Sequence, residues 1–330
     1  MSSVLSSIPF SLLELASVPV GSDIRSTLLD LRTYAKKADE LGFTRLWLAE
    51  HHNMEGVTSS ATCVLIADIA QQTERIRVGS GGIMLPNHPP LIVAEQFGTL
   101  EALHPGRIDL GLGRAPGTDP ITSRALHRDD RRADKFPQEV EELQYFLGPY
   151  KGHGVRAYPG SDSNVPIWIL GSSMFSAQLA AAKGLPYSFA GHFAPALAEQ
   201  ALSYYRENFQ PSTALDKPHA ILCLPLILGT DDAEAEYLAT SSKQRILALI
   251  QGKPLYIPAP VESMDGLWDP ISKMHVENFL GLSVVGGPET VAFKLQSVIE
   301  RFAVDELMFT NDIYSRDKRI QALELLAQLT

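Results

Sequence analysis

The stretch RIRVGSGGIMLPNHPPLIVAEQFGTLEALHPGRIDLGLGRA, residues 75–115, contains the repeating unit from which the fold can be predicted. The apolar run at 75–85 is typical of a buried strand, and residues 89–103 have a helical pattern that opens on proline. A second apolar run follows at 106–115. Strand, helix and strand in this order are typical of two parallel strands joined by a right-handed crossover. The stretch therefore predicts an α/β fold with a parallel sheet.

The same unit recurs along the chain and predicts eight strands, nearly all followed by a helix. We expect the strands at 8–16, 44–50, 75–85, 106–115, 167–171, 187–192, 219–229 and 305–310. We expect the helices at 26–43, 60–73, 89–103, 134–147, 174–184, 195–208, 231–250, 288–302 and 316–329. Eight such units in 330 residues favour a (β/α)8 TIM barrel with loop insertions, and the alternative is an open doubly wound sheet.

No break in composition divides the chain, so we expect residues 1–330 to form a single barrel domain. Three segments lack a clear pattern and are expected to be insertions, near 115–133, 148–166 and 252–283. Long loops of this kind are often functional, and the last two segments are candidate lids over the mouth of the barrel.

Composition limits the class of function. The net charge of −10 excludes the basic surface that nucleic-acid binders need, and 45% hydrophobic residues are enough for a large core. No apolar run reaches the roughly 18 residues of a membrane helix, and the first residues lack the positive start of a secretory signal. The two cysteines, Cys63 and Cys223, lie in apolar runs typical of buried thiols. We therefore expect a cytoplasmic protein without nucleic-acid or membrane partners.

Four motifs stand at the ends of predicted strands, where a barrel carries its chemistry. They are EHH at 50–52, GSGG at 79–82, GRAPG at 113–117 and GSS at 171–173. They belong to different strands, but the carboxyl ends of parallel barrel strands meet at one mouth. The sequence therefore predicts a single active site built from these motifs.

The EHH motif has three interpretations. Neighbouring side chains of a strand alternate in direction, so at most one of His51 and His52 should face the barrel axis if the strand persists to that point. One imidazole is sufficient for acid–base catalysis. A metal-dependent hydrolase built on both histidines would need further ligands, and neither HExxH nor paired cysteines occur in the chain. A solvated polar strand end is the third interpretation.

The glycines of the second motif weaken the strand that holds them. Glycine in a strand is tolerated where a backbone or a flat ligand approaches closely, so Gly81 and Gly82 could carry a planar ring; a bulge is the alternative. The GRAPG motif is not a dinucleotide fingerprint, because its glycine spacing is wrong and Ala115-Pro116 interrupts the helix that should follow.

A phosphate site is predicted at the start of the helix at 174–184. Ser172, Ser173 and Ser176 add hydroxyl groups to free backbone N–H groups, which favour an anion. Arg114, at another strand end, has a guanidinium suited to phosphate. The alternatives are ordinary N-capping by the serines and a surface ion pair for the arginine.

Together these motifs resemble the bacterial luciferase-like flavin-dependent monooxygenase family. The resemblance rests on LGFTRLWLAEHHNM (41–54), on the stretch from IRVGSGGIML to GRAPGTD (76–119) and on WILGSSMFSAQLAAAKGLP (168–186). It extends along nearly the whole chain and is closer to the single-chain oxidoreductases than to the subunits of the light-emitting enzyme. It implies a TIM barrel that takes reduced FMN from a separate reductase. It also implies that oxygen adds to the flavin as a peroxyflavin, which oxidises a small organic substrate.

The resemblance also implies roles for individual residues. His51 would be the catalytic acid or base, and a cis peptide between Gly81 and Gly82 would lie under the flavin ring. Arg114, Ser173 and Ser176 would bind the phosphate, with Ser172 contributing backbone. A homodimer would form through the helices near 62–72 and 89–103.

Two departures leave the substrate open. Gly113 replaces a luciferase cysteine, and His192 is expected in the space that aromatic residues fill in luciferase. A flavin-binding barrel without turnover and a deazaflavin-dependent oxidoreductase remain the alternatives.

Overall fold

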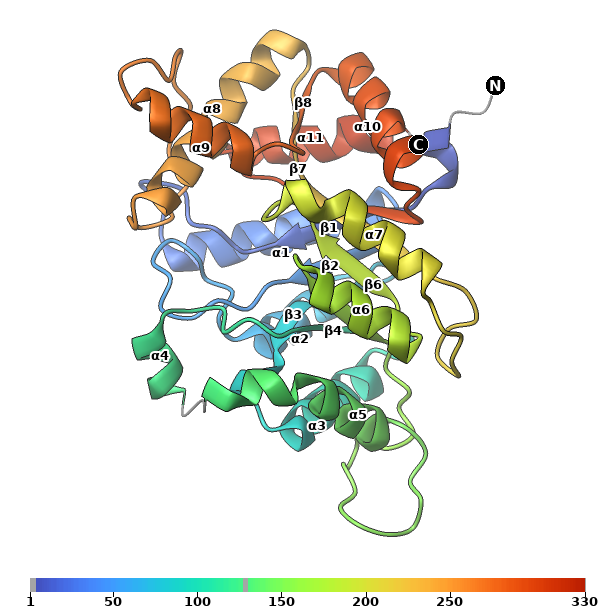
Figure 1. Ribbon diagram of the computed structural model, residues 1–330. Helices are drawn as coiled ribbons and strands as arrows, with labels where there is room; N and C mark the ends of the chain where they lie inside the picture. Colours follow the sequence, from blue (N-terminus) through green and yellow to red (C-terminus); the bar gives the residue numbers. More distant parts are fainter. Residues whose placement is uncertain (1–3, 127–129, 330) are drawn as a thin grey trace.

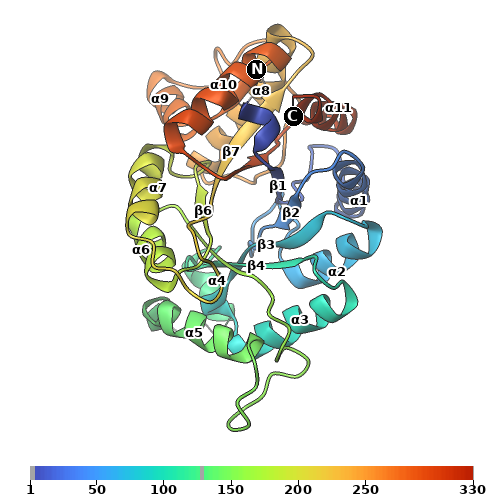
Figure 2. The same cartoon turned by 90° about the vertical axis from the view of Figure 1, so that its right-hand side faces the viewer.

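The computed structural model describes residues 4–126 and 130–329, and these form a closed barrel of parallel strands surrounded by helices (Figures 1 and 2). This confirms the TIM barrel and excludes the open sheet. The ring closes because β6 pairs with β7, and β9 lies between β7 and β1. The barrel strands are β1 Phe10–Glu14, β2 Arg45–Leu48, β3 Arg77–Met84, β4 Ile108–Gly113, β5 Ile167–Gly171, β6 Tyr187–Ala190, β7 Ala220–Leu228 and β9 Glu306–Thr310.

The predicted helices are all present and cover the outside of the barrel (Figure 2). They are α1 Ile24–Glu40, α2 Thr62–Gln72, α3 Pro90–Leu103, α5 Phe136–Leu147, α6 Met174–Lys183, α7 Ala198–Glu207, α8 Asp232–Ile250, α10 Pro288–Phe302 and α11 Arg316–Ala327. Besides short 3-10 helices, one strand and two α-helices were not predicted: β8 Val284–Gly286, which pairs with the end of β7, and α4 Pro120–Ala125 and α9 Pro270–Phe279. No helix among the described residues is long and apolar enough to cross a membrane.

Helix α1 shows how local sequence sets these boundaries. The Asp23 side chain accepts a hydrogen bond from the Ser26 N–H at 2.8 Å, which caps the helix start. Leu31, Ala35 and Ala38 are buried at helical spacing. The helix ends before Gly42, whose φ of +83° suits glycine.

The interior of the barrel follows the two-residue period of its strands. On and just after β2, Trp47 and Ala49 join an apolar cluster inside the barrel, whereas Leu46 and Leu48 belong to the larger core between barrel and helices. The interior cluster consists of Leu13, Trp47, Ala49, Trp168, Ile221, Cys223 and Met308.

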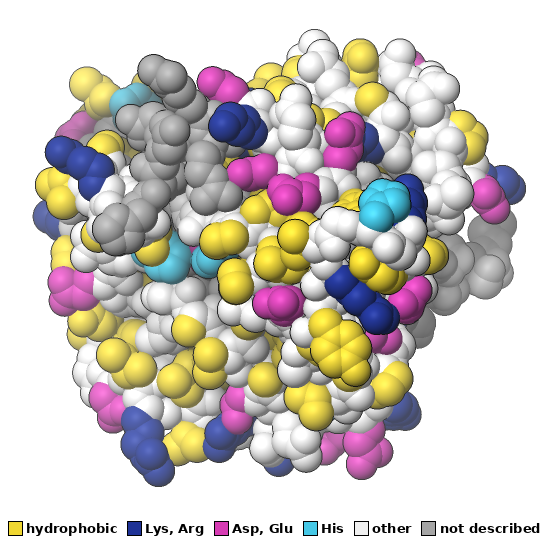
Figure 3. All heavy atoms as spheres, turned by 90° about the horizontal axis from the view of Figure 1, so that it is seen from below, with side chains coloured by type: hydrophobic (Ala, Val, Ile, Leu, Met, Phe, Trp, Pro, Cys, Tyr) yellow, Lys and Arg dark blue, Asp and Glu magenta, His cyan; other side chains and the backbone are white. Residues whose placement is uncertain are grey.

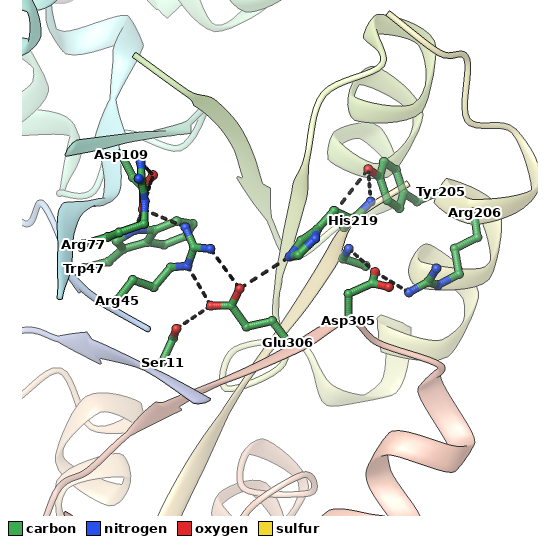
Figure 4. A network of polar contacts seen from close by, with 11 residues as sticks. Ser11, Arg45, Trp47, Arg77, Asp109, Tyr205, Arg206, His219, Asp305 and Glu306 are labelled. Atoms are coloured by element: carbon green, nitrogen blue, oxygen red, sulfur yellow. Dashed lines mark hydrogen bonds and ion pairs between the residues drawn. The ribbon is translucent and has the colours of Figure 1, made fainter. Parts of the chain in front are cut away.

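Charged side chains fill the amino-terminal end of the barrel interior (Figure 4). Arg45 donates to Glu306 and to Asp109, each at 2.7 Å, and Arg77 donates to Asp109 at 2.6 Å. Ser11 donates a further hydrogen bond to Glu306. Burial alone would raise the pKa of Glu306, but the hydrogen bond from His219 and the charge of Arg45 lower it. This layer packs the amino-terminal end and leaves the carboxyl end for a cavity.

Two of the three expected insertions lie at one end of the barrel and the third lies at the other end. The segment near 115–133 contains α4, and 127–129 lie outside the described residues. The segment 252–283 contains α9, on the same side of Figure 1 as α4. The loop 148–166 instead runs from α5 to the start of β5, and its Gly160 packs against Gly98 of α3. The expectation that 148–166 is a lid over the mouth is therefore wrong, because this loop precedes its strand.

Candidate active site

A cavity of about 330 Å³ opens at the carboxyl ends of the strands. It brings together all six residues predicted to bind the cofactor: Gly81, Gly82, Arg114, Ser172, Ser173 and Ser176. We call it the main cavity. Its other lining residues are Leu13, Trp47, Met84, Gly113, Ala115, Phe136, Leu170, Gly171, Phe175, Ser188, Ala190, His192, Phe193, Cys223 and Met308.

One wall of the main cavity is bare backbone. The peptide bond between Gly81 and Gly82 is cis, as the family resemblance implied. A Cβ at Gly81 would lie 2.9 Å from the Trp47 Cβ, and one at Gly82 would lie 2.7 Å from the carbonyl oxygen of Gly111. No side chain fits at either position, so the wall stays flat and can receive a planar ring.

Another part of the cavity, at the ends of the neighbouring strands β4 and β5, combines a cation, hydroxyl groups and a helix start. Arg114 lies with its guanidinium carbon 4.0 Å from the centre of the Phe175 ring. Ser173 is the N-cap of α6, but its side chain makes no capping hydrogen bond. The Ser176 hydroxyl donates to the Ser173 carbonyl at 2.8 Å and contacts the Tyr187 hydroxyl at 3.1 Å. Ordinary side-chain capping therefore does not explain Ser173, and the arrangement can bind a phosphate group.

Glu50 is a buried carboxylate that connects the segment after β2 to the segment after β3, and it is not open to a substrate. Only 1% of its surface is exposed. One of its oxygens lies 2.8 Å from His52 Nε2, 2.9 Å from His88 Nε2 and 3.2 Å from the Asn87 amide. The other accepts from the Met84 N–H at 3.1 Å. Burial would raise the pKa of Glu50, but the hydrogen bonds from His52 and His88 lower it to about 2, so the group is ionised.

His51 faces a second, smaller pocket of about 90 Å³, which we call the side pocket. His192 and Phe193 line both the side pocket and the main cavity, so the two adjoin at these residues. Burial, with the nearby charge of Arg245, lowers the pKa of His51 to about 4. The side pocket is lined by Leu15, His51, Met54, His192, Phe193, Pro225, Ser242, Arg245, Ile246, Leu249, Leu255, Phe279, Leu280, Thr310 and Asp312.

Comparison with known proteins agrees with this geometry. The sequence profile of the family described as luciferase-like monooxygenase matches residues 9–306. The chain belongs to the luciferase-like monooxygenase family. It is 46% identical over 320 residues to a luciferase-like monooxygenase of Escherichia coli (strain K12), covering 96% of each chain. It is 48% identical over 321 residues to the protein YvbT of Bacillus subtilis (strain 168), covering 97% of this chain and 96% of YvbT.

Solved structures of similar fold support the same assignment. The crystal structure of apo-MsnO8 superposes with a TM-score of 0.86 at 32% identity, covering 98% of both chains. The oxygenating constituent of 3,6-diketocamphane monooxygenase from Pseudomonas putida, solved with FMN, gives a TM-score of 0.72 at 18% identity over 98% of this chain and 97% of that one. An F420-dependent secondary alcohol dehydrogenase superposes with a TM-score of 0.69 at 15% identity, covering 97% of this chain and 98% of that one. The last two similarities show the fold alone.

The histidine pair of this luciferase-like monooxygenase is divided between two sites. Glu50, His52 and His88 place three possible ligand atoms within 4.8 Å of one another, and His51 is not part of that group. The hypothesis of a metal site built on both His51 and His52 is therefore wrong. The Glu50 carboxylate lies within hydrogen-bond distance of both imidazoles of this group.

Several residues of the luciferase-like monooxygenase site were not found from the sequence. His192 was expected near the flavin, but not as a residue that lines both pockets. Trp47, Cys223 and Met308 line the main cavity and belong to the interior cluster. The two-residue period of each strand was a signal that could have identified them. Arg245 had no such signal, because it lies on a helix.

Replacement of Gly82 by alanine is expected to destabilise this luciferase-like monooxygenase by about 1–3 kcal/mol, because the new Cβ meets backbone that cannot move aside. Thermal unfolding followed by circular dichroism measures the change. Gly281→Ala is the matched control, since its nearest contact would be a looser 3.1 Å. Equal melting temperatures for the two variants would show that the wall at Gly82 is not rigid.

Proposed function

We propose that this chain is an FMN-dependent monooxygenase, organised as a single barrel domain with insertions, which uses reduced flavin and dioxygen to oxidise a small organic substrate. The observation that carries the proposal is the main cavity itself. It joins the flat glycine wall at Gly81–Gly82 to the anion-binding corner of Arg114 and Ser173. A planar ring and a phosphate group are the features of FMN that these two parts of the cavity can receive.

The residues of the chain fit this cofactor by their chemistry. Arg114, with Ser172, Ser173 and Ser176, would hold the phosphate, and Gly81 and Gly82 would carry the ring. When bound, reduced FMN supplies the two electrons with which dioxygen gives one atom to the substrate and the other to water. His51 would move a proton at the substrate from the side pocket. Because its pKa is about 4, its imidazole is neutral near pH 7 and accepts protons.

The choice of FMN is supported by the FMN complex of the diketocamphane monooxygenase constituent. The F420-dependent dehydrogenase among the structural neighbours keeps a deazaflavin as the second candidate. Absorbance titration of the protein with FMN and with F420 ranks the two. Tighter binding of F420 would replace the monooxygenase proposal by a deazaflavin-dependent oxidoreductase.

Substitution Arg114→Ala tests the phosphate corner. We expect the Kd for FMN to rise by about 10- to 100-fold, because a charge-assisted hydrogen bond contributes about 1.5–3 kcal/mol. Fluorescence quenching of the flavin measures the Kd. Riboflavin is the matched control, since it has the same ring without the phosphate, and its affinity should be the same for both proteins. An equal loss for FMN and riboflavin would mean that Arg114 acts on the ring or on the fold.

The proposal includes partners and location. A separate reductase would supply reduced FMN in transient encounters. A homodimer would form through α2 and α3, where Val64 and Leu103 are 68% and 64% exposed although both helices are largely apolar. Apolar side chains also lie among charged ones on the face of α3 and α5 in Figure 3. Free thiols at Cys63 and Cys223 are consistent with a cytoplasmic location.

A further inference from the structure

The side pocket has balanced charge. Arg245 and Asp312 are its only acidic or permanently basic residues among those described, and they form an ion pair at 2.5 Å. Arg245 also donates from Nε to the Leu255 carbonyl at 3.1 Å, and only 6% of its surface is exposed. An anion bound at this guanidinium would lie beside the Asp312 carboxylate, which repels it, and displacing Asp312 would leave that carboxylate without its cation.

The other polar side chains of the side pocket are the two neutral imidazoles of His51 and His192 and the hydroxyls of Ser242 and Thr310. The Nδ1 atoms of His51 and His192 are buried, and neither has a hydrogen-bond partner within the described ranges. Burial lowers the pKa of each histidine to about 4. The side pocket therefore has no net positive charge.

The remaining wall is apolar and the space is small. Ile246 and Leu249 come from α8, and Leu255, Phe279 and Leu280 come from the insertion at 252–283. A volume of about 90 Å³ holds on the order of three to six non-hydrogen atoms. Apolar walls with one or two polar groups favour a compact molecule with a single polar atom.

We propose that the side pocket selects a compact neutral organic substrate, such as a small ketone, aldehyde or thioether, and rejects carboxylates and sulfonates. The inference rests on the proposed function, since it names the substrate class of that reaction. Arg245 and Asp312 set the specificity through their pairing, because their charges cancel and the side pocket then has no net charge to attract an ionic substrate.

The test compares butanone with propanoate, which have the same number of non-hydrogen atoms and differ in charge. Binding is measured in flavin-free protein from the shifts of the His51 and His192 ring signals in NMR spectra. In the wild type, we expect butanone to bind at least about tenfold more tightly than propanoate. Substitution Asp312→Asn leaves Arg245 as an unpaired cation, so propanoate should gain at least about tenfold relative to butanone.

The control is Glu199→Gln, which breaks an exposed pair with Arg301 (2.8 Å) and should keep the wild-type ratio. Equal or reversed affinities in the wild type, or imidazole signals that respond to neither probe, would overturn the inference even if Asp312→Asn does not fold. An unchanged ratio in folded Asp312→Asn would also overturn it. The binding test contains no flavin, so its result does not depend on whether the protein turns over with FMN. Turnover is tested separately by mixing protein, reduced FMN, air and butanone.

Discussion

Substitution Arg45→Ala is expected to lower the free energy of unfolding by about 3–5 kcal/mol, because it leaves two buried carboxylates without their shared cation. Arg45 lies between Asp109 and Glu306, and both carboxylates are at most 1% exposed. Its guanidinium carbon also lies 4.7 Å from the centre of the Trp168 ring. Figure 4 shows that the arginine bridges strands on opposite sides of the barrel interior.

The measurement is urea unfolding followed by circular dichroism and by tryptophan fluorescence, since Trp47 and Trp168 report on the barrel interior. Arg32→Ala is the matched control. Arg32 also pairs with a carboxylate, Asp68, at 2.6 Å, but its side chain is 42% exposed, so its loss should cost less than about 1 kcal/mol. Similar losses for the two variants would show that the buried layer contributes no more than a surface ion pair.

Substitution His51→Ala is expected to reduce substrate oxidation by about 10²- to 10⁴-fold while the affinity for FMN changes little. The first part follows from the proposed role in proton transfer, and the second from geometry, because His51 lines the side pocket and not the main cavity. Turnover with reduced FMN and air gives the rate, and fluorescence quenching gives the Kd. The exposed His153, on the loop 148–166, supplies the control His153→Ala.

The pH dependence of the wild type gives a second view of His51. Its pKa is lowered to about 4, so the neutral form that accepts protons persists as the pH falls from about 8 to about 5. We expect kcat/KM to show no loss from this imidazole in that range and to fall as the pH approaches 4. An acid limb near the ordinary histidine value of about 6.5, absent in His51→Ala, would show that the imidazole is exposed during catalysis. Unaffected oxidation in His51→Ala would favour a flavin-binding protein without turnover.

The repeating strand–helix pattern was sufficient to predict the barrel because buried parallel strands are continuously apolar and their helices carry one buried face. The elements that it missed are short or lack such a face. In α9 the only described buried residue is Val276, and β8 has three residues, so neither gives a periodic signal. The loop 148–166 was assigned to the mouth because length alone does not tell at which end of a barrel a loop lies.

Much of the candidate site was also predictable, for a topological reason. All strands of a TIM barrel point the same way, so Gly81, Arg114 and Ser173 at strand ends must lie near one another. β2 ends at Leu48, so strand alternation does not reach His51 and His52, and it is the loop after the strand that gives them different partners. Local sequence therefore determined which side chains reach the mouth.

Tertiary structure alone decided how those side chains are paired. Glu50 contacts His88, which is 38 residues away in the sequence. Arg245 pairs with Asp312 over a sequence separation of 67 residues, and Arg45 pairs with Glu306 over 261. These partners come together only when the barrel closes and its loops pack, and no local pattern encodes that closure. The sequence by itself determined the barrel and the residues at its mouth, because strand direction and alternation are local properties. Only the folded chain decided which charges cancel and which imidazoles stay neutral, because burial and ion pairing depend on distance in space.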